Sequence, residues 1–168
     1  MGFFDRLFNR QKETPKVEKR TVSNLRIGDI VTYDLQDYQV VGKLRYNDSG
    51  FVWDAYQLQG ETGVLWLGVE MDDELELGMY RTVKLPLNEP IPKQVTHDGR
   101  KYRLEEHGTA YVKGEGRSQN VHGKEVKYFD FEDESGEHFL SVEVWGSEVE
   151  VSYGYTIEEY ELKILAGS

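Results

Sequence analysis

Two short segments of the chain combine aromatic side chains with carboxylates in the same order. Each has an aromatic residue, a small residue and a glutamate at alternate positions. The residues are Trp66, Gly68 and Glu70 in the first segment and Phe139, Ser141 and Glu143 in the second, followed by Trp145. An aromatic face attracts a cation and a carboxylate pairs with it, so this combination suits an organic cation such as a polyamine. The candidate ligand-binding residues are therefore Trp66, Glu70, Phe139, Glu143 and Trp145.

The alternative interpretation of these residues is structural. The two aromatic and acidic faces would bury against each other, with each glutamate paired to a lysine or arginine. A buried glutamate without such a partner would have a raised pKa, which would favour the ligand hypothesis.

Other chemistry has little support in the sequence. There is no GxSxG, HExxH, P-loop or dinucleotide-binding motif, and there is no cysteine. The four histidines have spacings that match no metal motif, and the acidic run at residues 70–76 lacks the order and the glycine of a calcium loop. We therefore expect no catalytic residue, no metal and no cofactor, and a protein that is not an enzyme. An uncharacterised enzyme remains the least favoured alternative.

The elements that carry the candidate residues have the pattern of β-strands. Each segment starts with a small residue and a glycine, a turn signal, and then alternates between two faces. The face opposite the candidate residues is apolar and is expected to point into the core. Its residues are Leu67, Val69 and Met71 in the first segment and Leu140, Val142 and Val144 in the second.

The order of these patterns occurs twice along the chain. Residues 31–34 match residues 95–98 at an offset of 64, and the strand of Leu67 matches that of Leu140 at an offset of 73. The sequence predicts an all-β fold, an internally duplicated antiparallel β-meander in which two similar small barrel-like or sandwich-like halves pack together. Because residues 85–92 contain three prolines, we place the boundary there. The first β-repeat is residues 21–88 and the second is residues 89–168, packed as one globular unit.

Residues 1–20 differ from the rest of the chain. Four apolar residues recur at helical spacing, and basic residues lie opposite them. They are Phe3, Phe4, Leu7 and Phe8, with Arg6 and Arg10. We expect a short amphipathic helix on a flexible tether that docks on a membrane surface or a membrane protein. The alternative is a terminal helix that frays in water or packs on its own domain.

The charge is unevenly distributed between the head and the body. Residues 1–20 hold six basic and three acidic residues, and the remainder holds 14 basic and 28 acidic ones, so the net charges are +3 and −14. A body this acidic repels phosphate backbones, which argues against nucleic acid as a partner. No apolar run has the ~20 residues of a membrane span. We expect a cytoplasmic protein with peripheral attachment to the inner membrane through the head.

The chain resembles a bacterial family catalogued as domain of unknown function 4178. The resemblance covers roughly residues 23–164 and is carried by four segments taken together. They are Leu25-Arg26-Ile27-Gly28-Asp29, Tyr38-Gln39-Val40-Val41-Gly42, Trp53-Asp54-Ala55-Tyr56-Gln57-Leu58 and Trp66-Leu67-Gly68-Val69-Glu70. The resemblance implies a small bacterial β-domain and brings no catalytic residue with it. The leading hypothesis is a non-enzymatic binding or adaptor module at the inner membrane, and the alternative is a binder of a small organic cation.

The membrane hypothesis predicts a difference between the full chain and a truncated chain that begins at Thr21. In co-sedimentation with liposomes that contain anionic lipid, the full chain should pellet and the truncated chain should not, because the apolar stripe and its basic residues are removed. Equal pelleting of the two would reject docking on lipid.

Overall fold

The computed structural model describes residues 19–167, so the predicted N-terminal helix lies outside the described residues. About 64% of the described residues are in β-strands, and there is no α-helix among residues 19–167, which confirms the all-β class. The strands are β1 (Ile30–Tyr33), β2 (Gln36–Asp48), β3 (Phe51–Gln59), β4 (Val64–Met71), β5 (Leu75–Val83), β6 (Gln94–His97), β7 (Arg100–Gly116), β8 (Glu125–Asp133), β9 (His138–Trp145), β10 (Glu148–Ile157) and β11 (Leu162–Leu165). Two short 3₁₀ segments, η1 (Arg117–Val121) and η2 (Glu159–Glu161), interrupt them.

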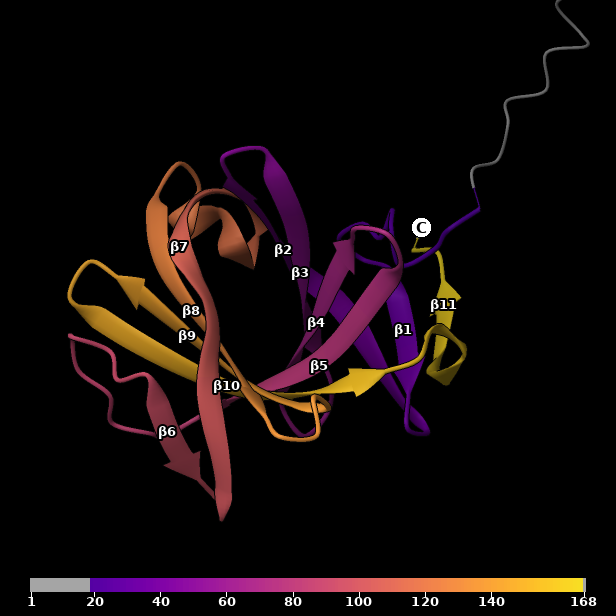
Figure 1. Ribbon diagram of the computed structural model, residues 1–168. Coiled ribbons are helices and arrows are strands. Elements are labelled where there is room, and N and C mark those ends of the chain that lie inside the picture. The colour runs from indigo at the N-terminus through magenta and orange to yellow at the C-terminus, as the bar shows by residue number, and fades with distance from the viewer. Residues whose placement is uncertain (1–18, 168) are drawn as a thin grey trace, which may run out of the picture.

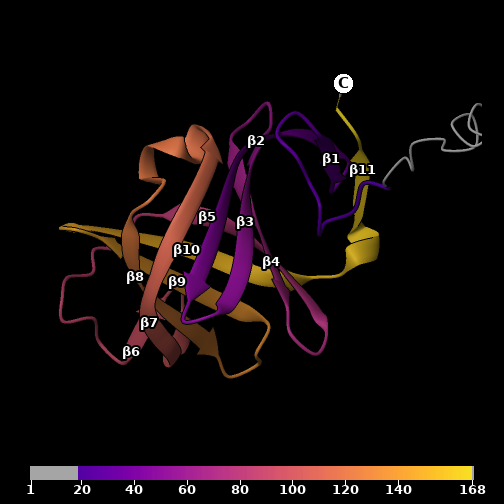
Figure 2. The same cartoon turned by 90° about the horizontal axis from the view of Figure 1, so that it is seen from above.

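Eight of the strands close into an antiparallel barrel. Their order is β2-β3-β4-β5-β10-β9-β8-β7, and β7 pairs back onto β2. β11 and β1 extend the sheet beside β2, and β6 extends it beside β7 (Figures 1 and 2). The prediction of two small barrel-like or sandwich-like halves packed together is therefore wrong. The two sets of strands share one continuous sheet because the edges of one set pair with the edges of the other, at β5–β10 and at β2–β7.

Two long strands make this closure possible because each changes partner along its length. β2 pairs with β1 near its start and with β7 from Gly42 onward, and its pairing with β3 shifts register between Val40 and Gly42. β7 pairs with β6 near its start, and its register with β8 shifts between Leu104 and Glu106. Such irregularities bend a strand and increase its twist, so each long strand can leave one neighbour and join another.

The predicted internal duplication stays a prediction, because both sets of strands build the same barrel.

Three clusters of apolar side chains stabilise the sheet. One is formed mainly by β1–β5 and includes Leu67, and another is formed mainly by β6–β10 with the preceding linker and includes Leu140. The third is formed by side chains on the opposite face of the barrel strands, such as Tyr46 and Val112.

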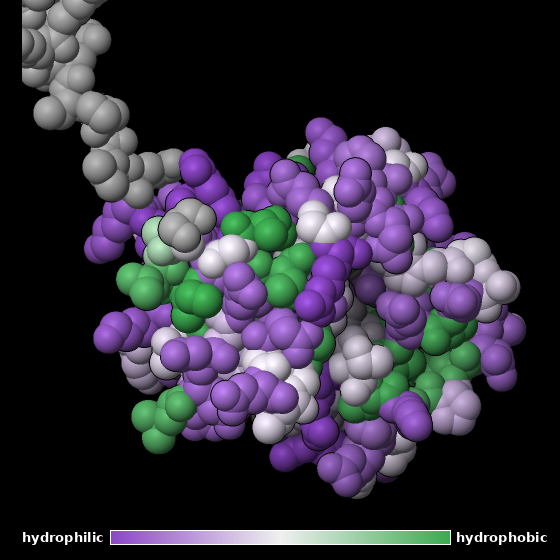
Figure 3. Space-filling model, turned by 180° about the vertical axis from the view of Figure 1, so that it is seen from behind, coloured by the Kyte–Doolittle hydropathy of each residue, from purple (hydrophilic) through white to green (hydrophobic). Residues whose placement is uncertain are grey.

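On the face of the molecule in Figure 3, hydrophilic residues cover most of the surface and hydrophobic ones gather in two separate areas.

The predicted core face of β4 and β9 is buried, with one exception. Leu67, Val69, Leu140, Val142 and Val144 are all buried. Met71 is 60% exposed, so its assignment to the core is wrong. It is the last residue of β4 and still pairs with Leu75, but it adjoins the acidic turn at residues 72–74, so its side chain lies at the end of the hairpin beyond the packed core.

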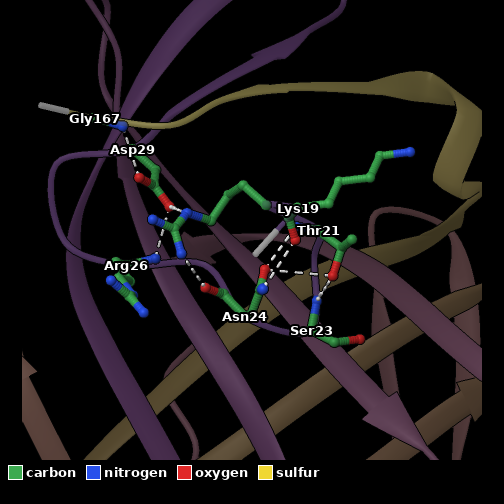
Figure 4. A network of polar contacts seen from close by, with 8 residues as sticks. Lys19, Thr21, Ser23, Asn24, Arg26, Asp29 and Gly167 are labelled. Carbon is green, nitrogen blue, oxygen red and sulfur yellow. Dashed lines mark hydrogen bonds and ion pairs between the residues drawn. The ribbon is translucent and has the colours of Figure 1, made fainter. Parts of the chain in front are cut away.

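A buried aspartate links the first described residues of the chain to the last ones (Figure 4). Asp29 accepts hydrogen bonds from the backbone amides of Arg26 and Gly167, both at 2.8 Å, and pairs with Arg20 at 2.9 Å. The preceding Gly28 has a φ of 96°, as its place in a turn requires. A truncation at Thr21 would remove the Arg20 ion pair, so the liposome comparison is better made with a chain that begins at Lys19.

Truncation of the two buried leucines should cost stability because each leaves a cavity in a separate apolar cluster. Leu67→Ala and Leu140→Ala should each lower the free energy of unfolding by about 2–5 kcal/mol. Lys101→Ala, an exposed position on β7, is the control and should change it by less than about 0.5 kcal/mol. Denaturant unfolding measures all three, and a leucine variant as stable as the control would contradict the placement of that side chain.

Candidate functional site

The barrel encloses a cavity of about 1470 Å³. Side chains from all eight barrel strands and from η1 line it. An eight-stranded barrel is wide enough either to be filled by its own side chains or to hold one small ligand. The five residues predicted as ligand-binding all line this one cavity: they are Trp66 and Glu70 on β4 and Phe139, Glu143 and Trp145 on β9. Their role in binding stays a prediction, but the structure brings them together from two strands that are not neighbours in the sheet.

The lining is strongly acidic. It contains thirteen acidic residues and two basic ones, Arg117 and Lys124, which lie in or next to η1. The acidic residues are Asp54, Glu70, Glu74, Glu76, Glu105, Glu106, Glu125, Asp130, Glu132, Glu143, Glu148, Glu150 and Glu158. Arg117 is exposed and donates a hydrogen bond to Gln59 at 2.8 Å. The acidic side chains therefore dominate the potential inside the barrel, which favours cations over anions.

Three pairs of acidic residues face each other directly across neighbouring strands. They are Glu70 and Glu76 on β4 and β5, Glu106 and Asp130 on β7 and β8, and Glu143 and Glu150 on β9 and β10. All six line the cavity. Like charges directly opposite in an antiparallel sheet are destabilising. The barrel wall therefore carries three unfavourable pairs that a bound cation would relieve.

Glu143, Asp130 and Glu70, which line the barrel cavity, have raised pKa values. Burial raises the pKa of Glu143 to about 7, against hydrogen bonds from Tyr46 and Trp145 that lower it. Burial also raises the pKa of Asp130 to about 7, and the charges of Glu106, Glu143 and Glu70 add to this shift. Burial followed by the charge of Glu76 raises the pKa of Glu70.

The ion pairs that the structural alternative requires are not present. Among residues 19–167, neither Glu70 nor Glu143 forms an ion pair with a lysine or arginine. Asp130 has no hydrogen-bond or ion-pair partner within the same range. These carboxylates therefore lie in the barrel without a cationic partner from residues 19–167.

Aromatic side chains form the rest of the wall. All three tryptophans line the cavity. Trp53 on β3 stacks on Tyr46 with ring centroids 5.1 Å apart and meets the edge of Tyr128 at 5.1 Å. Tyr128 in turn donates a hydrogen bond to Asp48 at 2.5 Å. These contacts hold the rings in fixed positions, as recognition of a cation by aromatic faces requires.

Several residues of the cavity were not predicted from the sequence. Tyr46, Tyr80, Tyr128 and Asp130 were not among the predicted ligand-binding residues. A usable signal exists in β8, where Tyr128, Asp130 and Glu132 alternate with apolar residues as they do in β4 and β9. In β2 and β5 the polar face could be assigned only after the partner strands were known.

Metal binding is not indicated by the geometry. The described residues contain no group of three or more histidine, cysteine, aspartate or glutamate side chains that could hold a metal ion. Two histidines have structural contacts instead: His122 accepts a hydrogen bond from the Gly114 amide at 3.1 Å, and His138 lies 2.8 Å from the Tyr153 hydroxyl. The same described residues contain no helix that is long and apolar enough to cross a membrane.

The fold and its lining define a small antiparallel β-barrel with an acidic, aromatic cavity. The chain belongs to the family described as "Domain of unknown function (DUF4178)", which matches residues 26–159 and confirms the resemblance. An uncharacterized protein of Aquifex aeolicus is 28% identical over 185 residues, covering 97% of each chain. An uncharacterized protein of Mycobacterium tuberculosis is 31% identical over 146 residues, covering 82% of this chain and 69% of the relative. No solved structure matches the chain.

Substitution of Glu143 should change how stability depends on pH. Because the pKa rises from 4.5 to about 7 on folding, the folded state holds this proton more tightly than the unfolded state does. The unliganded chain therefore loses stability as the pH rises from about 4.5 to about 7. Glu143→Gln keeps a hydrogen-bond acceptor and removes the charge, so it should raise the free energy of unfolding at pH 8 by about 1–3 kcal/mol.

The gain should disappear at about pH 4, below both pKa values, where the wild-type side chain is protonated in both states. Glu137→Gln, at an exposed position before β9, is the matched control and should show no such dependence. Denaturant unfolding at the two pH values measures the effect. An equal change from Glu143→Gln at both would contradict the burial of this charge.

Proposed function

We propose that the chain is a non-enzymatic binding protein whose barrel cavity takes a small organic cation. The observation that carries the proposal is the composition of the cavity lining. It contains thirteen acidic side chains and all three tryptophans, but only two basic residues. Aromatic faces and carboxylates together recognise organic ammonium groups through cation–π attraction and charge-assisted hydrogen bonds. Glu70, Glu143 and Asp130 supply charge without a protein counter-ion, and Trp66, Phe139 and Trp145 supply the aromatic faces.

The shape and charge of the cavity favour an organic cation over other ligands. The negative potential of the carboxylates would repel an anion or a nucleic acid. A metal ion would need three or more ligands close together, and the described residues offer no such group. A cavity of about 1470 Å³ also exceeds what a single ion needs. A ligand with several atoms and with apolar as well as charged parts matches both kinds of side chain on the wall.

The internal duplication is part of this proposal. What supports it is the position of two opposed glutamate pairs: Glu143 follows Glu70 by 73 residues, and Glu150 follows Glu76 by 74. A copied β-meander would have carried one acidic pair into each half of the barrel. The two copies would then enclose the site between them.

The role as an adaptor at the inner membrane is a further part of the proposal and concerns residues 1–20. What supports it is the sequence of the head, with a net charge of +3 against −14 for the body. An acidic body is repelled by an anionic lipid surface, so a basic apolar head would be the segment that holds the protein there. In this arrangement the barrel stays in the cytoplasm and collects its ligand there.

Titration with spermidine tests the binding proposal. All three tryptophans line the cavity, so a cation that enters should change tryptophan fluorescence and the signal should saturate. The measurement is made at about 0.15 M salt to screen long-range attraction. The double variant Glu70→Gln/Glu143→Gln should bind at least tenfold more weakly, and Glu137→Gln should bind like the wild type. Absence of any saturable change with the wild-type chain would reject this function.

A further inference from the structure

Tyr80 lines the cavity at a position where neighbouring glycines leave room for its ring. It lies on β5, directly opposite Trp66 on β4 and Gly154 on β10. A Cβ atom added at Gly154 would lie 2.3 Å from Cδ1 of Tyr80, and one added at Gly78 would lie 2.7 Å from Cε2. A Cβ atom at Gly68 would lie 3.1 Å from Cε2. Atoms on both edges of the ring therefore touch the wall, so the ring lies along the wall rather than across the cavity.

Backbone conformation does not require glycine at these three positions. None of them has a positive φ, and all three lie inside strands, where glycine weakens the sheet. Glycine at such a position often marks the close approach of another group. Here that group is the Tyr80 ring, which three neighbouring strands accommodate by lacking side chains. The ring is only partly buried, so part of it remains available to a ligand.

The aromatic side chains next to Tyr80 form a row across the sheet. Trp66 is opposite Tyr80, Tyr80 is opposite Gly154, and Gly154 is opposite Phe139, so the row crosses β4, β5, β10 and β9. Apart from Gly154, each member is aromatic, and all three aromatic residues line the cavity. The row therefore places three aromatic side chains at one level of the barrel.

Acidic pairs lie on both sides of this row. Glu76 precedes Tyr80 by four residues on β5, and Glu150 precedes Gly154 by four residues on β10. Because β5 and β10 are antiparallel, these two glutamates lie in opposite directions from the row, each about 13 Å along its strand. Each faces a second glutamate, Glu70 or Glu143.

We propose that Tyr80 determines the specificity of the cavity, and that the cavity selects linear cations with two or more positive charges separated by an apolar segment. This inference rests on the proposed function. The apolar segment lies on the aromatic row with Tyr80 at its centre. The charged ends point in opposite directions along the barrel, one toward the Glu70–Glu76 pair and the other toward the Glu143–Glu150 pair, without bridging them, because the two pairs lie about 26 Å apart along the strands. The unpartnered carboxylate of Asp130, which also lines the cavity, contributes to holding the charges. A cation with one charge satisfies only part of this arrangement.

Isothermal titration calorimetry of the full chain with butylamine, 1,8-diaminooctane and spermidine tests the selection. The titrations are made at one ionic strength, adjusted with sodium chloride. The wild-type chain should bind the two multivalent amines at least tenfold more tightly than butylamine. Equal affinity for all three amines would overturn the inference and leave the proposed function standing. Absence of binding by every amine would overturn the proposed function and the inference together.

Variants of Tyr80 test whether the ring is responsible. Tyr80→Phe keeps the aromatic face and should bind spermidine within about twofold of the wild type. Tyr80→Leu keeps an apolar side chain without that face and should lose about tenfold in affinity. Tyr160→Leu removes a tyrosine that is 86% exposed and outside the cavity lining, and should bind like the wild type.

Gly154→Ala tests whether the position of the ring matters, because the added methyl group displaces the ring without changing Tyr80. It should weaken spermidine binding about as much as Tyr80→Leu does, provided that its thermal unfolding remains cooperative. If it does not fold, the Phe and Leu variants of Tyr80 still decide the question. Wild-type affinity in Tyr80→Leu would overturn the role of the ring.

Discussion

The rest of the structure depends on the pairing of two sheet edges with two others. β5 pairs with β10 and β2 pairs with β7, and these two ladders turn the strands of the chain into a closed ring. A free edge exposes unpaired backbone groups and invites association with other chains. Closure removes the edges of all eight barrel strands along these ladders. It also gives every barrel strand an inner face, and this is why residues from distant parts of the sequence meet in one cavity.

The inner face is an unusual place for so many carboxylates. Apolar clusters centred on residues such as Leu67 and Leu140 lie on the other side of the same strands. These clusters supply the burial that holds the sheet together, so the wall of the cavity is free to carry side chains that do not stabilise the fold. Opposed acidic pairs, raised pKa values and strand glycines all oppose folding. Features that violate local rules in this way tend to occur at functional sites.

The two ends of the described chain are held by a different kind of interaction. Asp29 is 2% exposed and joins Arg20, the Arg26 amide and the Gly167 amide. Through these contacts the first turn and the last residues of the described chain lie against each other beside β1 and β11.

Local patterns in the sequence were enough to identify β4 and β9 as strands and to assign their two faces. Alternation identified the strands of Leu67 and Leu140, their buried sides apart from Met71, and the aromatic and acidic sides that now line the cavity. Alternation depends only on the geometry of a single strand, so it can be recognised without knowing the partner. The match to the family over residues 26–159 agrees with these segments.

Only the tertiary structure decided that the strands close into one barrel, and therefore which side chains face each other. Partner strands are chosen by contacts between residues far apart in the sequence, and one slip of register would exchange the inner and outer faces. Asp130, Tyr46 and Tyr80 could not be joined to Glu143 or Trp66 before that choice was known. Burial, which raises the pKa of Glu143 and Asp130, is likewise a property of the closed barrel. The chemistry of the site was present in the residues, and its geometry came from the pairing of β2 with β7 and of β5 with β10.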